Sequence, residues 1–144
     1  PPDSEEGAGL ERAMRLALAN APRQPEEIDS VFAHGPGDPQ MDRVESRCLV
    51  RVLEARARRI PVTSIKGVTG NPMGTGGAHQ VIAAALALRH GLVPPTANYE
   101  FPDPDCDLDY VPGAPRAAGL RSALINTHGF GRGNSSLILE RPPR

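Results

Sequence analysis

The sequence predicts an α/β fold in which helices cover a mixed sheet, and three observations lead to it. Short apolar runs alternate with segments of helical periodicity along the first ninety residues, as in layered α/β domains. Two further apolar runs flank a glycine-containing loop near the end of the chain, which indicates an antiparallel hairpin. The 15 glycines and 16 prolines fall between these segments without a repeating period, so they mark loops. The chain of 144 residues has the size of a single domain.

Two amphipathic helices are predicted over residues 8–19 and 41–59. In each, apolar residues recur at a spacing of three and four, which places them on one face. Pro22 and Pro61 end these segments. The strands are expected at 28–33, 62–65, 123–127 and 135–139, with a further edge pairing at 108–111.

A third helix is predicted over residues 77–90, and it is apolar on almost every side. It carries the run Ala-Ala-Ala-Leu-Ala-Leu, which is typical of a helix buried between two layers. The rest of the chain offers few elements to cover both sides of it. We therefore expect a fragment or a subunit whose missing layer comes from another half or another chain.

Composition argues against several classes of function. The net charge is −1, from 16 basic and 17 acidic residues that are spread along the chain, so neither a nucleic-acid nor a membrane-surface footprint is expected. No run reaches the ~18 apolar residues of a membrane span, and the acidic first residues are unlike a signal peptide. Cys48 and Cys106 do not make a disulfide framework, which favours a reduced, cytoplasmic protein. His79, His90 and His128 lack the spacing of metal ligands and are interpreted as structural or surface residues.

Three glycine-rich loops each follow a predicted strand, at residues 34–38, 66–77 and 128–134. Glycine allows the backbone to approach a ligand closely, and loops at strand ends are where α/β proteins place binding groups. Each loop also carries a polar side chain. Converging loops of this kind could form a pocket for an acyl thioester.

The loops contain four motifs in a fixed order. The first is His34-Gly35-Pro36-Gly37-Asp38, followed by Asp42 and Glu45. The second is Lys66, Gly70 and Asn71, followed by glycines at 74, 76 and 77. The third runs from Gly91 through Pro94-Pro95-Thr96 to Asn98, and the last is Gly129-Phe130-Gly131-Arg132-Gly133-Asn134. Over residues 8–139 this order resembles the C-terminal half of the β-ketoacyl synthases, condensing enzymes of the thiolase-like superfamily.

The resemblance implies a thiolase-like half-domain spanning residues 1–144, with a mixed sheet, a buried alanine-rich helix and a C-terminal β-hairpin. The N-terminal half would be absent from the chain. The implied activity is acyl transfer: decarboxylative Claisen condensation of malonyl-carrier protein with an acyl thioester, in fatty acid or polyketide synthesis. No cofactor or metal is implied beyond the phosphopantetheine arm of an acyl carrier protein. That carrier protein and the N-terminal half, or a partner ketosynthase subunit in a homodimer or heterodimer, are the implied partners.

The resemblance also assigns roles to residues. His34 and Asn71 would donate hydrogen bonds to the enolate oxygen, and Lys66 would order the site in a pair with the supporting Glu45. Substrate contacts are implied for Thr69, Gly129, Phe130, Gly131 and Asn134. The family's nucleophilic cysteine lies upstream of residue 1, and neither Cys48 nor Cys106 matches it.

Asn71 departs from the family pattern, which has a second histidine there. A carboxamide donates a hydrogen bond but carries no titrating proton. Initiating synthases and chalcone synthases use a cysteine–histidine–asparagine set, so His34 with Asn71 could still form a working site. The alternative is a non-catalytic chain-length-factor or scaffold subunit that pairs with an active ketosynthase. Retention of His34 favours the first interpretation.

Overall fold

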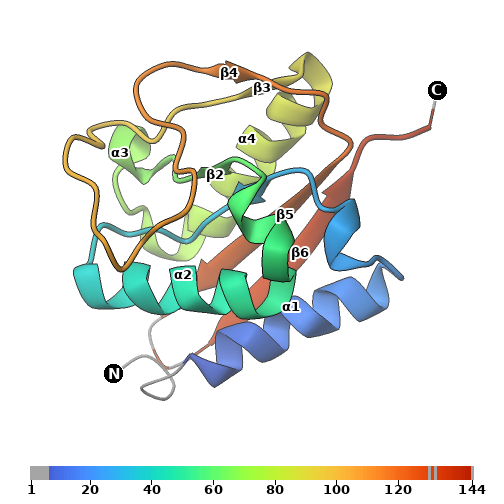
Figure 1. Cartoon of the computed structure of the whole chain (residues 1–144), viewed down its shortest axis with the longest axis horizontal. Helices are drawn as coiled ribbons and strands as arrows, with labels where there is room; N and C mark the ends of the chain where they lie inside the picture. The colour runs from blue at the N-terminus through green and yellow to red at the C-terminus, as the bar shows by residue number, and fades with distance from the viewer. Residues whose placement is uncertain (1–6, 130, 132, 144) are drawn as a thin grey trace.

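The computed structural model describes residues 7–129, 131 and 133–143. Within them a four-stranded mixed sheet has the order β2-β1-β5-β6. β1 (Val31–Phe32) pairs in parallel with β2 (Val62–Thr63) and with β5 (Ser122–His128), and β5 pairs antiparallel with β6 (Asn134–Glu140). Helices α1 (Ala8–Asn20) and α2 (Pro39–Leu53) pack on one face and α4 (Gly76–His90) packs on the other (Figure 1). The predicted layered α/β fold with a mixed sheet is confirmed.

The predicted hairpin is also confirmed, with slightly longer strands. β5 and β6 pair continuously from Ser122 opposite Glu140 to His128 opposite Asn134. The short strands β1 and β2 extend less far than the predicted runs. The segment at 108–111 is not a strand, although the carbonyl of Asp109 accepts a hydrogen bond from Val62 N at 2.8 Å. A second ladder that the sequence did not indicate joins β3 (Leu92–Val93) to β4 (Arg116–Ala117).

Helix α2 differs from its predicted range at both ends. It begins at Pro39 because the Asp38 side chain accepts a hydrogen bond from Met41 N at 2.8 Å and caps the first turn. It ends at Leu53, where Glu54 takes a positive φ of 51°. The chain continues as the 3₁₀ helix η2 (Glu54–Arg58). The prediction of one helix through residue 59 was therefore wrong, because the backbone leaves the α-helical conformation at Glu54. Ala57, in η2, is buried.

The predicted loop at 66–77 contains two short helical turns. These are α3 (Lys66–Thr69) and the 3₁₀ helix η3 (Met73–Thr75), which leads directly into α4. A further 3₁₀ turn, η1 (Pro25–Glu27), precedes β1. Short turns of this kind are common as connectors, and they carry too few residues to show a period in the sequence.

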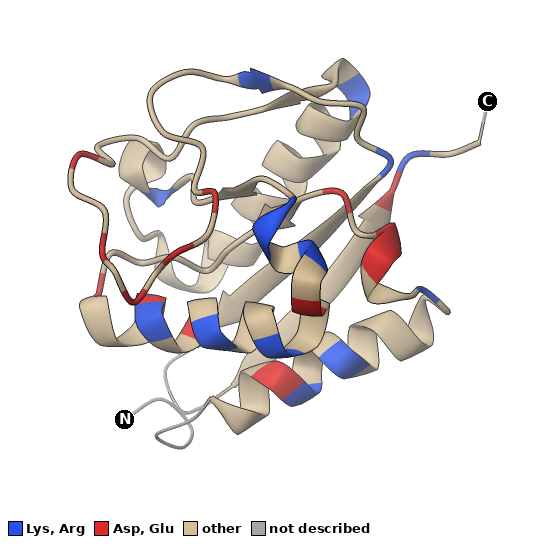
Figure 2. Cartoon of the chain, viewed as in Figure 1, with Lys and Arg blue, Asp and Glu red and all other residues tan. Residues whose placement is uncertain are grey.

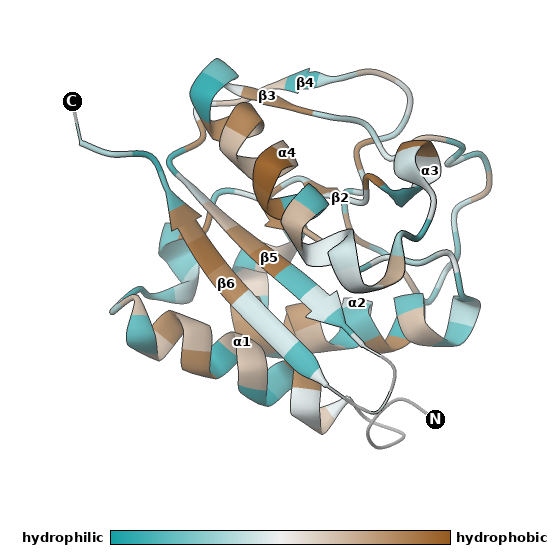
Figure 3. Ribbon diagram, turned by 180° about the vertical axis from the view of Figure 1, so that it is seen from behind, coloured by the Kyte–Doolittle hydropathy of each residue, from teal (hydrophilic) through white to brown (hydrophobic). Residues whose placement is uncertain are grey.

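Helix α4 is buried along one side only. Gln80, Ala84, Ala87 and Leu88 lie in the core, whereas Ile82 remains 58% exposed and Leu86 50% exposed. Figure 3 shows the apolar colouring of α4 beside the sheet. The expectation that another half or another chain covers the exposed side chains of α4 stays a prediction.

Figure 2 shows basic residues along α2 and several acidic residues on the loop that runs beside it. The aspartate-rich segment at 103–109 is tied to the helical layer by ion pairs, with Arg43 Nε 2.9 Å from Asp103 Oδ2 and Arg58 Nη2 2.8 Å from Asp107 Oδ2. Exposed pairs of this kind contribute at most about 1 kcal/mol each. Among the described residues, no helix is long and apolar enough to cross a membrane.

Candidate active site

The His34 loop leaves the end of β1 and is held by one carboxylate. The side chain of Glu45, on α2, is only 5% exposed. Its Oε1 accepts hydrogen bonds from His34 N at 3.0 Å and from Asn126 Nδ2 at 3.1 Å, and its Oε2 accepts one from Gly35 N at 3.0 Å. Glu45 therefore fixes the first two residues of the loop against both α2 and β5. Its supporting role in the reaction stays a prediction.

The imidazole of His34 is oriented through its Nδ1. Lys66 Nζ lies 2.9 Å from this atom, and the backbone N–H of His128 donates to it at 3.1 Å. Because both neighbours donate, Nδ1 is the acceptor and the neutral ring carries its proton on Nε2. Burial, with the positive charges of Lys66 and His128, lowers the pKa of His34 to about 4. At neutral pH His34 is thus an uncharged Nε2–H donor.

Lys66 begins α3 and is 7% exposed. Burial lowers its pKa to about 8, an effect that the carboxylates of Glu45 and Asp42 partly oppose. Its Nζ also donates to the carbonyl of His34. The predicted ion pair between Lys66 and Glu45 is wrong. The Glu45 carboxylate accepts hydrogen bonds from N–H groups instead, and Lys66 Nζ contacts His34.

The other residues predicted from the second loop lie apart from this cluster. Asn71 is exposed, and the described part of the chain gives its side chain no hydrogen-bond partner. Thr69 is exposed as well, and its hydroxyl lies 2.9 Å from the carbonyl of Gly70. No hydrogen bond among the described residues joins either side chain to His34.

The closing loop links β5 to β6. Gly129 N donates to the carbonyl of Gly133 at 2.8 Å, and Gly131 takes a φ of +86°, which favours glycine. Asn134 contacts His128, with Asn134 Oδ1 2.7 Å from His128 Nδ1. Phe130 lies outside the described residues. The predicted substrate contacts of this loop stay predictions.

Two residues near His34 were missed as parts of the site. Gln80 on α4 is 2% exposed, and its Nε2 donates to the carbonyls of Ala33 at 2.6 Å and Asn126 at 3.0 Å, joining the ends of β1 and β5. The sequence did carry a signal for Gln80, since it is a polar residue within an otherwise apolar helix. His128, interpreted as structural or surface, lies against His34 with ring centroids 5.8 Å apart. The sequence carried no signal for this contact, because the pairing of His128 with Asn134 is set by the register of the hairpin.

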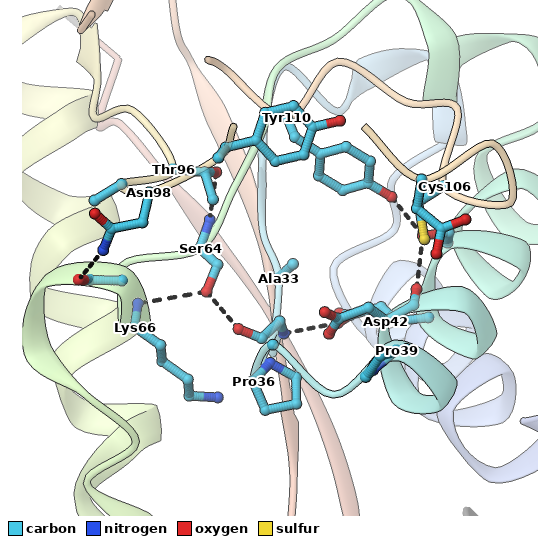
Figure 4. Close-up of a pocket in the computed structure, with 18 of the residues that line it drawn as sticks. Ala33, Pro36, Pro39, Asp42, Ser64, Lys66, Thr96, Asn98, Cys106 and Tyr110 are labelled. Atoms are coloured by element: carbon cyan, nitrogen blue, oxygen red, sulfur yellow. Dashed lines mark hydrogen bonds between the residues drawn. The ribbon is translucent and has the colours of Figure 1, made fainter. Parts of the chain in front are cut away.

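A cavity of about 480 Å³ opens beside the His34 loop (Figure 4). Ser64, Lys66 and Asn98 line one side of it, and Asp42 and Cys106 lie on the other. Other parts of its wall come from the loop at 96–101, from the His34 loop and from side chains of α2.

Asp42 is the carboxylate in this wall with a raised pKa. Burial, followed by the charge of Glu45, raises its pKa to about 6. Its Oδ1 is buried and has no hydrogen-bond partner among the described residues. Since ionised carboxylates need such partners, Asp42 destabilises the fold once it is charged.

The variant Asp42→Asn should therefore stabilise the complete protein at pH 7 by about 1–2 kcal/mol. Between pH 4 and pH 6 the folded state holds the Asp42 proton that the unfolded state has lost, so stability falls as pH rises. Asparagine removes this fall, and its advantage should disappear below pH 4, where Asp42 is protonated in both states. Urea midpoints of variant and parent at pH 4 and pH 7 measure the difference.

Asp103→Asn is a matched control of opposite sign. The pKa of Asp103 is lowered by the backbone N–H of Asp105 and by Arg43, so this variant should lose stability at pH 7 and recover it in acid. An Asp42→Asn midpoint that is equal to that of the parent at both pH values would contradict the prediction.

Neither cysteine is activated as a nucleophile. Cys48 is buried on α2, and burial raises the pKa of its thiol. Burial also raises the pKa of the half-buried Cys106. A nucleophilic cysteine needs the opposite shift, because the thiolate is the reactive form. Among the described residues, no group of three His, Cys, Asp or Glu side chains is placed to hold a metal ion.

Comparison with known proteins identifies one family. Residues 2–100 match the model of the β-ketoacyl synthase C-terminal domain. The ketoacyl synthase alpha subunit of the tetracenomycin polyketide synthase from Streptomyces glaucescens is 42% identical over 137 residues, which are 95% of this chain and 32% of that protein.

Solved structures agree with this match. One is a type II polyketide synthase acyl carrier protein in complex with its ketosynthase bound to the hexaketide; the TM-score is 0.93 at 32% identity, over 97% of this chain and 34% of that one. Another is the ishigamide ketosynthase/chain length factor, with a TM-score of 0.89 at 38% identity, over 94% of this chain and 33% of that one. The chain thus spans about a third of the length of the curated relatives it matches.

Proposed function

The chain belongs to the β-ketoacyl synthase family, as its C-terminal domain, and from this premise we propose that it forms half of a condensing site. There malonyl-carrier protein would lose carbon dioxide, and the resulting enolate would attack an acyl thioester. An N-terminal half supplies the nucleophilic cysteine that holds the acyl group. The phosphopantetheine arm of the carrier protein delivers the malonyl group, and the site needs no metal.

The observation that supports this function best is the fixed, neutral His34. When the bond between the malonyl carboxylate and its neighbouring carbon breaks, the electron pair moves into an enolate and negative charge develops on the thioester oxygen. An oriented N–H donor aimed at such an oxygen stabilises it without giving up its proton. Because the pKa of His34 is lowered to about 4, its Nε2–H is present throughout the neutral range.

A second candidate function is that of a non-catalytic subunit that sets chain length beside an active ketosynthase. The substitution of Asn71 for the second family histidine, and its exposure without a partner among the described residues, favour this alternative. A ketosynthase/chain length factor structure is also among those similar to this chain.

Release of labelled carbon dioxide separates the two functions. The complete protein is purified alone and after co-expression with a partner subunit, then mixed with carrier protein bearing carboxyl-labelled malonyl groups. A condensing subunit should release label and form condensed product, and alkylation of its cysteine should stop condensation. Release that depends on the partner's cysteine alone would instead assign this chain to the non-catalytic class.

A further inference from the structure

His128 stands beside His34 at the end of the sheet. β1 and β5 are parallel neighbours, with Phe32 opposite Ile125, so the residues that follow them emerge at the same edge. The two imidazoles meet edge to face, with an angle of 68° between their planes and 5.8 Å between their centroids. His128 also touches His34 through its backbone, whose N–H donates to His34 Nδ1 at 3.1 Å.

The ring of His128 has a defined orientation. Asn134, its antiparallel partner, places Oδ1 2.7 Å from His128 Nδ1. A carboxamide oxygen only accepts hydrogen bonds, so Nδ1 carries the hydrogen and faces Asn134. The Nε2 atom of His128 is then left to act on a ligand. His128 is half-buried, as a group that meets a substrate should be.

Position 71 lacks these features. Asn71 is exposed and, within the described residues, makes no hydrogen bond. Its carboxamide also cannot carry a titrating proton, whereas an imidazole can do so near neutral pH. The structure therefore offers a second imidazole next to His34, but on β5 and not on the second glycine-rich loop.

We propose that His128 is a catalytic residue that supplies the second imidazole of the malonyl site, in place of the side chain at position 71. The inference rests on the proposed decarboxylation. As the carbon–carbon bond breaks and carbon dioxide leaves, the electron pair enters the enolate. The enolate oxygen accepts one hydrogen bond from His34 Nε2–H and a second from Nε2–H of His128 in its imidazolium form, in which Nδ1–H still faces Asn134. Both protons stay on their rings, so the step consumes no further reactant.

The test compares variants of the complete protein in release of carbon dioxide from malonyl-carrier protein. His128→Asn keeps an amide donor near Asn134 but has nothing in place of Nε2, and His128→Phe keeps the ring volume without polar atoms. His90→Asn, at the exposed end of α4, is the matched control. We expect both His128 variants to lose about 10²-fold in kcat, with KM for malonyl-carrier protein and the melting temperature close to those of His90→Asn.

The proposal is overturned if either folded His128 variant keeps a rate within threefold of the parent, because the imidazole is then not needed for the reaction. Such a result leaves the proposed function standing, since the parent and His90→Asn still release carbon dioxide. A parent that releases none, alone or with its partner, removes the proposed function and this role of His128 together.

Discussion

Replacing His34 by alanine in the complete protein is expected to lower the rate of malonyl decarboxylation by about 10²–10³-fold. The structure gives His34 a single orientation, because Lys66 Nζ and the N–H of His128 both face its Nδ1. The Nε2–H that remains is a preorganised donor, and alanine leaves the developing enolate charge without it. Initial rates of carbon dioxide release at saturating malonyl-carrier protein measure the loss.

Two further variants test whether the loss of rate comes from the missing Nε2–H donor. His34→Gln carries an amide nitrogen that can reach the place of Nε2, so it should recover part of the rate. His79→Ala changes an exposed histidine on α4 and should leave the rate unchanged. Undiminished decarboxylation in folded His34→Ala would exclude His34 from the chemistry and remove the main support for a condensing function.

The sequence predicted those parts of the fold that have a local signal. The helical period identified α1 and α4 almost to the residue, and the two apolar runs around a glycine loop identified the β5–β6 hairpin. The end of α2 and the β3–β4 ladder could not be predicted in this way. The first depends on a positive φ at Glu54 and the second on pairing across a long connection, and neither leaves a period in the sequence.

The residues of the candidate site, too, were predicted where the sequence carries a motif and missed where only the fold brings them together. Motif order identified His34, Lys66 and Glu45, and the structure brings all three together. Motif order did not predict which of them touch: the two carboxylate oxygens of Glu45 accept hydrogen bonds from three N–H groups, and Lys66 Nζ contacts His34. His128 was missed because strand register, and not sequence spacing, carries it to His34.

Glu45→Ala is expected to destabilise the complete protein by about 3 kcal/mol, since it removes the acceptor of several enclosed donors. His34 N, Gly35 N and Asn126 Nδ2 all lose their partner on Glu45. Each unsatisfied group costs about 1–3 kcal/mol, and relief of a buried charge offsets part of the sum. Denaturant midpoints of the variant and parent measure the change.

Glu45→Gln separates the contribution of the acceptors from that of the charge. Its one carbonyl oxygen can still receive part of the hydrogen bonds, so it should lose roughly half as much stability as alanine. Glu26→Ala, at an exposed glutamate in η1, should change the midpoint by no more than about 0.5 kcal/mol. If Glu45→Ala unfolded at the midpoint of Glu26→Ala, the loop would be held by something other than this carboxylate. If instead stability and decarboxylation fall together in Glu45→Ala and recover together in Glu45→Gln, the same hydrogen bonds that stabilise the sheet end also place His34 for the reaction.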